Sequence, residues 1–225
     1  MDLIPALDIK NNTIVSSYKG NRHSYKSICS KYFVPENVIN FINYIRNLSN
    51  IHTIYIADID AIMNLKQYKN NIKIIKKILY RFKNIDFIID HGIRSLREIN
   101  MYKNYTNYLP VIGTETFLEY RKLQKNKSLK YILSVDKHNN KILFKNNYVS
   151  QYKYINPSKI ICMNIDNVGT NRGPDIEFYK KIKKVYKNKD IIISGGIDIN
   201  RDLDEIKNHG CSKVIVLSSL LNKSI

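Results

Sequence analysis

Two aspartates stand at matching places in the chain. Asp8 and Asp136 each follow a short apolar run, and the segments around them, residues 4–15 and 132–143, align without a gap. Two carboxylates that face each other across a pocket suit removal of a proton by one and donation of a proton by the other. The alternative is that each aspartate caps or bonds nearby backbone. The repeat around both residues favours the catalytic interpretation.

Small residues follow two later apolar runs. The first set is Ser194, Gly195 and Gly196, and the second is Ser218 and Ser219. Glycine allows backbone N–H groups to approach phosphate oxygens closely. In a barrel of alternating strands and helices, the last two strand ends often form such a phosphate site. We therefore expect phosphate binding here, with a tight turn that holds no ligand as the alternative.

The corresponding place in the first half of the chain has different chemistry. It reads Asp90, His91 and Gly92, with Arg94 two residues on and the small-residue pair Gly113–Thr114 after the next run. A carboxylate repels phosphate, although Arg94 could offset it. The sequence thus predicts one good phosphate site and one impaired or repurposed site. His91 is interpreted as a hydrogen-bonded rim residue in preference to a general acid or base, because a lone histidine is weak support for catalysis.

Two polar loops could close over a substrate. Residues 19–26 contain Lys19 and Arg22, and residues 167–174 contain Gly169 and Thr170. The first could fold over an anionic ligand, or it could be a solvated charged loop. Asp58 and Asp166 also end apolar runs and are candidate substrate contacts. No histidine or cysteine accompanies them at metal-ligand spacing, so we expect neither a metal nor a cofactor.

These residues need elements to position them, and the chain supplies a regular alternation. Short β-branched runs typical of buried parallel strands alternate with stretches of helical periodicity. Eight such strands predict an α/β protein of the (β/α)8 TIM-barrel class. The predicted strands are 3–9, 53–58, 86–90, 109–113, 131–136, 159–166, 190–194 and 213–218. The predicted helices are 34–48, 65–82, 95–105, 117–124, 176–186 and 200–208.

The repeat divides this single domain, residues 1–225, into two half-barrels of about 1–125 and 126–225. Few residues follow the eighth run, so the last outer helix is expected to be truncated to a stub at 219–222. Apolar surface near the first and eighth strands would then need another cover. A homodimer partner is one possible cover.

Composition narrows the class of protein. The chain has 225 residues, 44% hydrophobic and 25% charged, and no apolar run long enough to span a membrane. Its start lacks the basic region of a signal peptide, and its three cysteines (Cys29, Cys162 and Cys211) form no disulfide or zinc pattern, so a cytoplasmic protein is expected. The net charge of +18 is spread along the chain together with abundant Ile, Asn and Tyr, which share AT-rich codons. We therefore expect a small phosphorylated substrate and no nucleic-acid partner.

The motifs together resemble a known family. The opening Ile4-Pro5-Ala6-Leu7-Asp8, the later Ser194-Gly195-Gly196-Ile197 and the paired halves are similar to the histidine-biosynthesis barrels. The resemblance covers nearly the whole chain. It implies a ligand with two phosphates and an Amadori rearrangement by two strand-end aspartates. By resemblance the aspartates are Asp8 and Asp136, and the phosphate site is Gly195, Gly196 and Ser218.

Further motifs resemble an isomerase-related branch found in methane- and C1-metabolising microbes. They are Lys19-Gly20-Asn21-Arg22, Tyr55-Ile56-Ala57-Asp58, Ile112-Gly113-Thr114-Glu115-Thr116 and Val168-Gly169-Thr170. The chain departs from the isomerase at Asp90-His91, where the isomerase has glycines, at Ser16 in place of an arginine, and in having no tryptophan.

We expect an isomerase or lyase of this superfamily, acting by proton transfer on a small sugar-phosphate-type substrate. Two alternatives stay open. One is the histidine-pathway isomerase itself, phosphoribosylformimino-aminoimidazole carboxamide ribotide isomerase. The other is an inactive barrel that serves as a binding or assembly partner.

Overall fold

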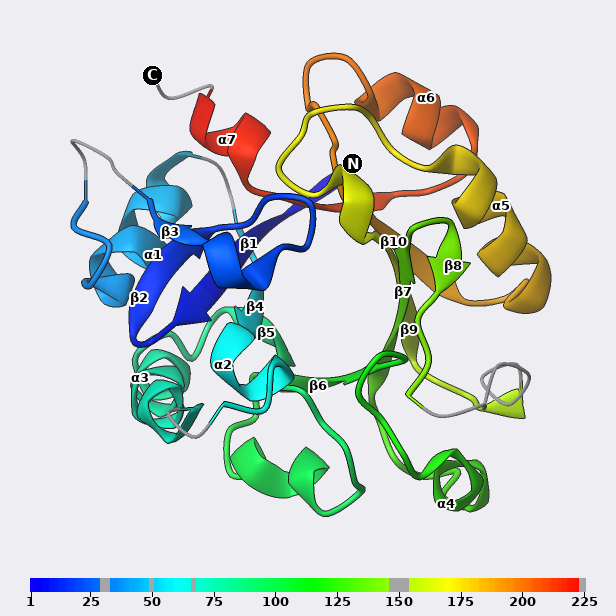
Figure 1. Cartoon of the computed structure of the whole chain (residues 1–225), viewed down its shortest axis with the longest axis horizontal. Helices are drawn as coiled ribbons and strands as arrows, with labels where there is room; N and C mark the ends of the chain where they lie inside the picture. Colours follow the sequence, from blue (N-terminus) through cyan, green and yellow to red (C-terminus); the bar gives the residue numbers. More distant parts are fainter. Residues whose placement is uncertain (29–32, 49–50, 66–67, 146–153, 223–225) are drawn as a thin grey trace.

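The computed structural model describes residues 1–28, 33–48, 51–65, 68–145 and 154–222. In this part of the chain, eight parallel strands close into a barrel, because the last strand pairs with the first (Figure 1). The (β/α)8 prediction is therefore confirmed, while the half-barrel repeat stays a prediction. In barrel order the strands are β1 (Asp2–Lys10), β4 (Thr53–Asp58), β5 (Asp86–Asp90), β6 (Tyr108–Gly113), β7 (Ile132–His138), β9 (Lys159–Asn164), β10 (Asp190–Ser194) and β11 (Lys213–Val216).

Strand side chains alternate between the barrel interior and the helix layer. On β4, Tyr55 belongs to the interior cluster, whereas Ile54 and Ile56 pack outward with the helices. The period of two along a strand produces this division. Both faces are buried, which explains why the strands read as continuous apolar runs. The interior is filled by residues such as Ile4, Ile88, Val111, Ile132, Ile161, Ile192 and Ile215.

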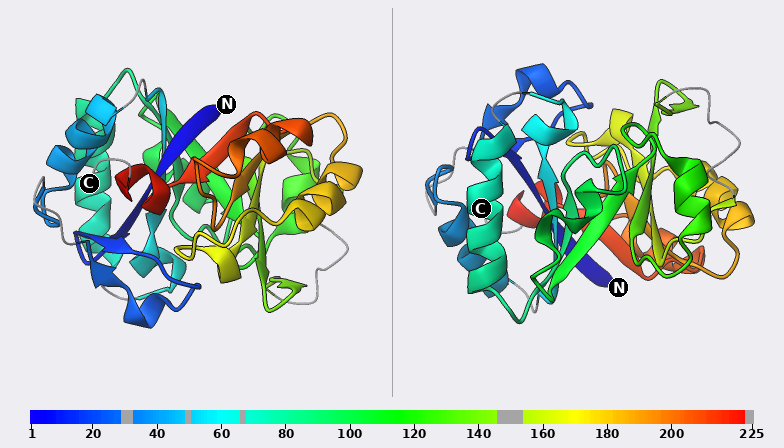
Figure 2. Two further views of the ribbon diagram at one scale, coloured as in Figure 1. Left: turned by 90° about the horizontal axis from the view of Figure 1, so that it is seen from above. Right: turned by 90° about the horizontal axis from the view of Figure 1, so that it is seen from below.

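Helices surround the barrel on its outside (Figure 2). In both views α1 (Val38–Leu48) and α3 (Tyr68–Arg81) lie on one side, and α5 (Ile176–Val185) and α6 (Leu203–Asn208) lie on the other. Each buries an apolar stripe, as with Ile75, Ile78 and Leu79 of α3. The outer layer is completed by the short α4 (Tyr120–Lys125) and by α7 (Ser218–Asn222).

The helix predicted at 95–105 is wrong in type. The chain there forms a short 3-10 helix, η2 (Glu98–Tyr102). Its two buried side chains, Ile99 and Tyr102, are three residues apart, which suits the three-residue turn of a 3-10 helix. The carboxylate of Glu98 accepts hydrogen bonds from the Arg94 backbone N–H (2.7 Å) and the Ser95 hydroxyl (3.2 Å), so the preceding turn is held by local polar contacts.

Two antiparallel hairpins extend the barrel strands that carry the aspartates. β2 (Thr13–Ser16) returns beside β1, and β8 (Lys141–Ile142) returns beside β7. Both turns consist of two asparagines with positive φ: Asn11 and Asn12 at 49° and 60°, and Asn139 and Asn140 at 49° and 58°. This is the backbone of a two-residue hairpin turn, for which asparagine is favoured.

Each hairpin turn is also tied to the short helix that follows the neighbouring barrel strand, α2 (Ile59–Ile62) after β4 or η4 (Ile165–Asn167) after β9. The backbone N–H of Asn11 donates to Asp60 Oδ2 at 2.6 Å. The backbone N–H of Asn139 donates to Asp166 Oδ2 at 2.8 Å. The two arms that bear Asp8 and Asp136 are thus fastened in the same way.

The final helix packs on the barrel in spite of its shortness. Leu220 is buried, and Leu217 and Leu221 pack against the cluster that contains Ile42. Large exposed hydrophobic side chains of the described residues lie elsewhere: Tyr18, Val34, Tyr80, Leu118 and Tyr154. The homodimer therefore stays a prediction without support from an uncovered patch beside α7.

The described segments contain no helix of the length and apolar character needed to cross a membrane. Cys162 and Cys211 are buried free thiols, and Cys29 lies outside the described residues.

Candidate active site

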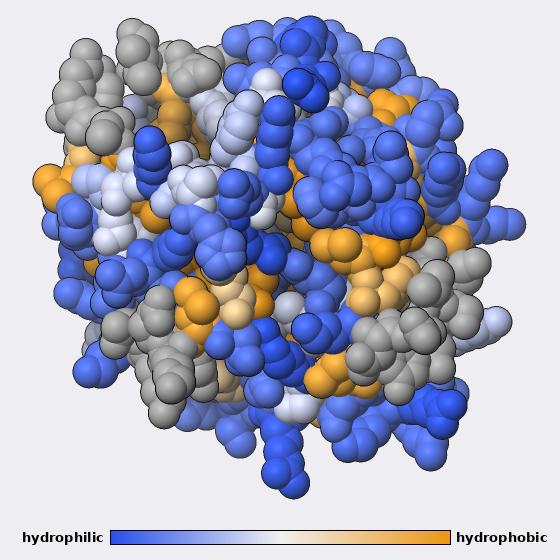
Figure 3. All heavy atoms as spheres, viewed as in Figure 1, coloured by the Kyte–Doolittle hydropathy of each residue, from blue (hydrophilic) through white to orange (hydrophobic). Residues whose placement is uncertain are grey.

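A pocket opens at the carboxyl ends of the barrel strands, with about 840 Å³ of free space including the part open to solvent. Asp8 of β1 and Asp136 of β7 both line it, together with Asp90 of β5 and Ser194 of β10. The two aspartates predicted from the repeat therefore share one pocket. The face of the molecule seen down the barrel is largely hydrophilic, with small hydrophobic patches (Figure 3).

Asp8 is a buried carboxyl that receives a hydrogen bond from one neighbouring side chain. Only 8% of its surface is exposed, and burial raises its pKa from the ordinary 3.8 to about 6. A hydrogen bond from the Ser17 side chain and the charge of Arg22 act in the opposite direction. Near neutral pH this group is mostly ionised and can accept a proton.

Asp136 is held more tightly and lies deeper. The Ser134 hydroxyl donates to its Oδ1 at 2.6 Å, and its backbone N–H donates to Thr114 Oγ1 at 3.1 Å. Burial, with the charges of Glu115 and Asp90, raises its pKa to about 8. Its Oδ2 is buried and has no hydrogen-bond partner among the described residues. Asp136 can therefore hold a proton at neutral pH, and one oxygen of this pocket residue is left without a hydrogen-bond partner among the described residues.

Asp90 is a third carboxyl of the same pocket. Its Oδ1 accepts a hydrogen bond from the Gly92 backbone N–H at 2.9 Å, and burial followed by the charge of Glu115 raises its pKa to about 7. A Cβ atom placed on Gly113 would lie 3.8 Å from Asp90 Oδ2 and 3.4 Å from Asp136 Oδ2. The two carboxyls thus lie beside Gly113 on the same side of β6.

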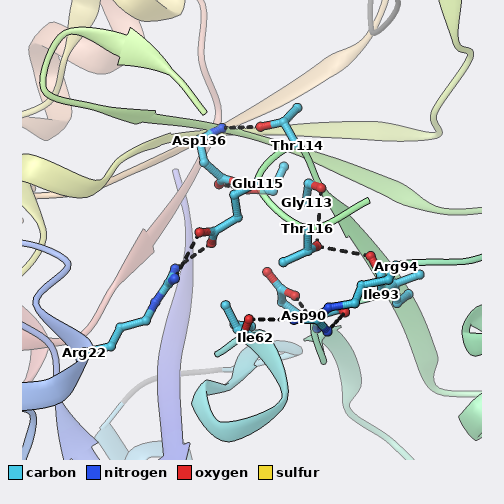
Figure 4. Close-up of polar contacts among 12 residues, drawn as sticks. Arg22, Ile62, Asp90, Ile93, Arg94, Gly113, Thr114, Glu115, Thr116 and Asp136 are labelled. Atoms are coloured by element: carbon cyan, nitrogen blue, oxygen red, sulfur yellow. Dashed lines mark hydrogen bonds and ion pairs between the residues drawn. The ribbon is translucent and has the colours of Figure 1, made fainter. Parts of the chain in front are cut away.

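A two-bond ion pair crosses the mouth of the pocket. Arg22, in the short 3-10 helix η1 (Arg22–Ser24), donates to Glu115 Oε2 at 2.9 Å and to Oε1 at 2.5 Å. Figure 4 shows Glu115 between Arg22 and Asp136. The loop predicted to cover the mouth is therefore attached to the opposite rim. Paired guanidinium and carboxylate groups in this fork geometry form strong, directional contacts.

Tyrosines add hydrogen-bond donors to the pocket wall. Tyr55 of β4 is buried, and burial together with the charges of Asp90, Asp136 and Asp8 raises the pKa of its hydroxyl well above 10. Burial also raises the pKa of Tyr25, which lines the pocket from the loop. Both phenols therefore stay protonated over the working pH range.

The predicted phosphate residues gather at another part of the pocket wall. Ser194, Gly195, Gly196 and Ser218 all line it. Gly195 has φ of +105°, and a Cβ there would lie 2.2 Å from the carbonyl oxygen of Asn164, so the turn requires glycine. Ser219 is the exception among the predicted set, because its buried hydroxyl does not line the pocket.

Several predicted substrate contacts have structural roles outside the pocket lining. His91 is 4% exposed and exchanges a 2.9 Å hydrogen bond with the Tyr108 hydroxyl, so its prediction as a rim residue is wrong. Burial lowers its pKa to about 4, which keeps the ring neutral. Arg94 donates to the carbonyl oxygens of Ala61, Gly92 and Ile62 (Figure 4) and is not among the residues that line the pocket.

Asp58 and Asp166 accept hydrogen bonds from backbone N–H groups and do not line the pocket. Asp58 caps α2 (Ile59–Ile62) by accepting the Ala61 N–H, and it also accepts from Asn71. Asp166 pairs with His138 at 2.7 Å and holds the second hairpin turn.

The remaining predicted contacts divide between the two loops and β6. Gly169 lines the pocket, and a Cβ there would lie 2.0 Å from the Ser17 carbonyl oxygen, because the two predicted flaps touch. Lys19 joins that contact through its backbone N–H, which donates to the Val168 carbonyl at 2.9 Å, while its ammonium lies over the Tyr18 ring. Thr170, Gly113 and Thr114 lie outside the lining, although Thr114 and Gly113 support Asp136 from behind.

Sequence reasoning missed several pocket residues. Asp90 ends a strand, as Asp8 and Asp136 nearly do, so the strand-end criterion applied evenly would have found it. Glu115 follows the small-residue pair Gly113–Thr114, and no pattern in the sequence marked it as a pocket residue. The polar lining residues outside the predicted set are Ser17, Tyr25, Tyr55, Asp90, Glu115 and Asn171. In the described ranges, no group of three or more histidine, cysteine, aspartate or glutamate side chains is placed so that it could hold a metal ion.

The fold is thus a closed (β/α)8 barrel with four carboxyls in a pocket at the carboxyl ends of its strands and a glycine turn after β10. Residues 2–225 match the profile of the family described as histidine biosynthesis protein, and the chain belongs to that family.

The relatives are similar over almost their whole length. An isomerase of Buchnera aphidicola subsp. Cinara cedri is 30% identical, with 97% of this chain and 93% of that protein covered. An isomerase of the same name from Prochlorococcus marinus strain MIT 9301 is 29% identical, with 98% and 88% covered. An uncharacterized protein of Methanocaldococcus jannaschii is 28% identical, with 98% and 93% covered. The isomerases are named for an imidazole-4-carboxamide that bears two phosphoribosyl groups. Membership of this family makes the chain an isomerase-type barrel.

Proposed function

We propose that the protein catalyses an Amadori-type isomerisation, in which an N-linked aldose phosphate becomes the corresponding aminoketose. The observation that carries the proposal is the pair Asp8 and Asp136 in one pocket, with pKa values raised to about 6 and about 8. At neutral pH one is mostly ionised and the other mostly protonated. Such a separation assigns the base and the acid.

The pair can complete the reaction without net gain or loss of protons. Asp136 gives its proton to the ring oxygen as the C1–O bond breaks and the nitrogen lone pair forms a C1–N double bond. Asp8 removes the proton from C2, which gives an enolamine. Asp8 returns that proton to C1 while the hydroxyl on C2 gives its proton to Asp136 and becomes the ketone. Both carboxyls then recover their starting states.

The other pocket residues would hold the substrate for this chemistry. Backbone N–H groups around Gly195, Gly196 and Ser218 suit one phosphate. The protonated Tyr55 hydroxyl can donate to a substrate oxygen near the carboxyls. The Arg22–Glu115 pair keeps the first loop over the mouth, which would limit water during the reaction.

The histidine-pathway isomerisation itself is the second candidate, and the names of the relatives favour it. Its substrate is the first one to test. Rescue of an isomerase-deficient histidine auxotroph by this chain, and loss of rescue with Asp8→Asn, would establish it. If the folded protein fails to rescue the auxotroph but converts another aminoaldose phosphate, the proposed reaction class would stand and the histidine-pathway substrate would be excluded. Absence of any turnover would favour the inactive barrel.

A further inference from the structure

The pocket has a charge that the whole chain does not share. The chain carries a net charge of +18, yet the pocket lining contains four carboxyls, Asp8, Asp90, Glu115 and Asp136, and a single guanidinium, that of Arg22. A general excess of lysine therefore does not explain this pocket. Its acidity is local and is built from strand ends and one loop.

Three of these carboxyls form one end of the pocket, which we call the acidic end: Asp90, Glu115 and Asp136. Arg22 is already used by Glu115 in two hydrogen bonds. Asp90 Oδ2 and Asp136 Oδ2 lie beside Gly113, and the Oδ2 of Asp136 is buried with no partner in the described part of the chain. A buried carboxyl oxygen without a hydrogen-bond partner costs free energy on the order of 1–3 kcal/mol, whether or not it carries the proton. The geometry leaves a place for a donor supplied from outside the protein.

A phosphate is a poor occupant of this place, because its oxygens are acceptors and its negative charge is repelled by every carboxyl of the acidic end that is ionised. Arg94, which the sequence offered as a compensating cation, is engaged by three backbone carbonyls. A protonated amine or an amidine has the required N–H donors and the opposite charge. Asp136 retains acceptor capacity whether or not it carries a proton.

We propose that the acidic end binds a protonated amine or amidine of the substrate, so that the substrate carries one phosphate, at Gly195, Gly196 and Ser218, and a basic nitrogen group at Asp90. This inference rests on the proposed function for the same pocket and specifies its substrate class. The class is a monophosphorylated amino sugar derivative, in contrast to the doubly phosphorylated compound for which the relatives are named.

The test is calorimetric binding of three matched hexoses to the purified protein at neutral pH: glucose 6-phosphate, glucosamine 6-phosphate and glucose 1,6-bisphosphate. We expect the amino sugar phosphate to bind about tenfold more tightly than glucose 6-phosphate, as a charge-assisted hydrogen bond supplies. The bisphosphate should bind no more tightly than glucose 6-phosphate. Equal binding of amine and hydroxyl, tenfold tighter binding of the bisphosphate, or no binding of any of the three would each overturn the proposal.

Variants assign the preference to the acidic end. Asp90→Asn keeps an oxygen for the Gly92 N–H, so folding is preserved, and it should abolish the preference for the amine while glucose 6-phosphate binds as before. Asp204→Asn, an exposed acid on α6, is the matched control and should keep the preference. Retention of the preference in Asp90→Asn would refute the assignment.

The outcome is separable from that of the proposed function. Asp8→Asn should stop turnover and leave the binding preference intact. If the protein prefers the amine but shows no turnover, the proposal for the acidic end would be supported and the isomerase proposal would be rejected.

Discussion

Arg22 and Glu115, 93 residues apart in the chain, meet in a two-bond ion pair over the pocket that Asp136 lines. The pair acts on Asp136 in two directions, because the charge of Glu115 raises the pKa of Asp136 and the charge of Arg22 lowers it. The same contact that attaches the loop therefore also sets the acidity of the proposed proton donor.

Substitutions at this pair should move the pH profile in opposite directions. The alkaline limb of kcat/KM reports loss of the proton from Asp136 in the free enzyme. We expect Arg22→Gln to shift that limb upward and Glu115→Gln to shift it downward, each by about one pH unit or less for a partly screened charge. Shifts of the same sign in both variants would show that the limb belongs to another group.

Loss of either aspartate should remove catalysis. The wild-type kcat/KM should be bell-shaped, falling below about pH 6 as Asp8 gains a proton and above about pH 8 as Asp136 loses one. Asp8→Asn or Asp136→Asn should lower kcat by a factor on the order of 10² or more, the usual loss for a general acid or base. Near-wild-type kcat in both variants would remove the pair from the mechanism.

The buried carboxyls should also make stability depend on pH. The folded pKa values of Asp90 and Asp136, about 7 and about 8, lie above the ordinary 3.8, so the folded state holds protons that the unfolded chain releases. Their contribution is fully present at low pH and is lost as pH rises through 7 and 8. His91, with its pKa lowered from 6.5 to about 4, acts in the opposite direction only below about pH 6.5.

In urea titrations the free energy of unfolding should therefore fall as pH rises from about 6.5, above which His91 no longer opposes the effect, to about 8, where the folded state loses the Asp136 proton. Asp90→Asn should flatten part of that slope and stabilise the protein at the alkaline end by roughly 1 kcal/mol per pKa unit removed. An unchanged slope would mean that Asp90 titrates alike in both states.

His91 should matter for folding and not for chemistry. Its ring is buried against Tyr102 and hydrogen bonds Tyr108, outside the pocket lining. His91→Ala should lower the free energy of unfolding by about 2 kcal/mol or more, from the cavity and the unpaired phenol. The kcat/KM measured on the folded fraction should change less than about twofold. A large loss of kcat/KM would show that His91 takes part in catalysis or substrate binding.

A negative charge at the glycine turn should weaken phosphate binding. Ser218 lines the pocket, so Ser218→Asp places a carboxylate where the phosphate is expected. We expect the Kd of glucose 6-phosphate to rise about tenfold or more, which corresponds to about 1.4 kcal/mol. Ser212→Asp, at an exposed position before β11, is the control. Equal Kd values in the two variants would place the phosphate elsewhere.

The strands could be predicted from sequence because burial on both faces leaves a continuous apolar run. The two aspartates could be predicted because a gapless repeat marks them. The residues that line the pocket could not be separated from structural ones, because the type of a residue does not reveal its hydrogen-bond partner. Arg94 donates to backbone carbonyls, whereas Arg22 reaches over the pocket to Glu115. His91 failed for the same reason, because its neighbours Tyr102 and Tyr108 come together only in the folded chain.

The asparagine turns beyond Asp8 and Asp136 have a consequence for the rates of substrate release and of the chemical step. Each acid is carried on a two-stranded arm whose tip is bonded to the short helix after a neighbouring strand, at Asp60 or Asp166. Movement of the loop that holds Arg22 therefore leaves the separation between proton donor and acceptor unchanged. Loop substitutions that spare Arg22 should change how long a substrate resides in the pocket, and hairpin substitutions should change how fast it reacts once there. The residence time of the substrate and the rate of its conversion would thus depend on different segments of the chain.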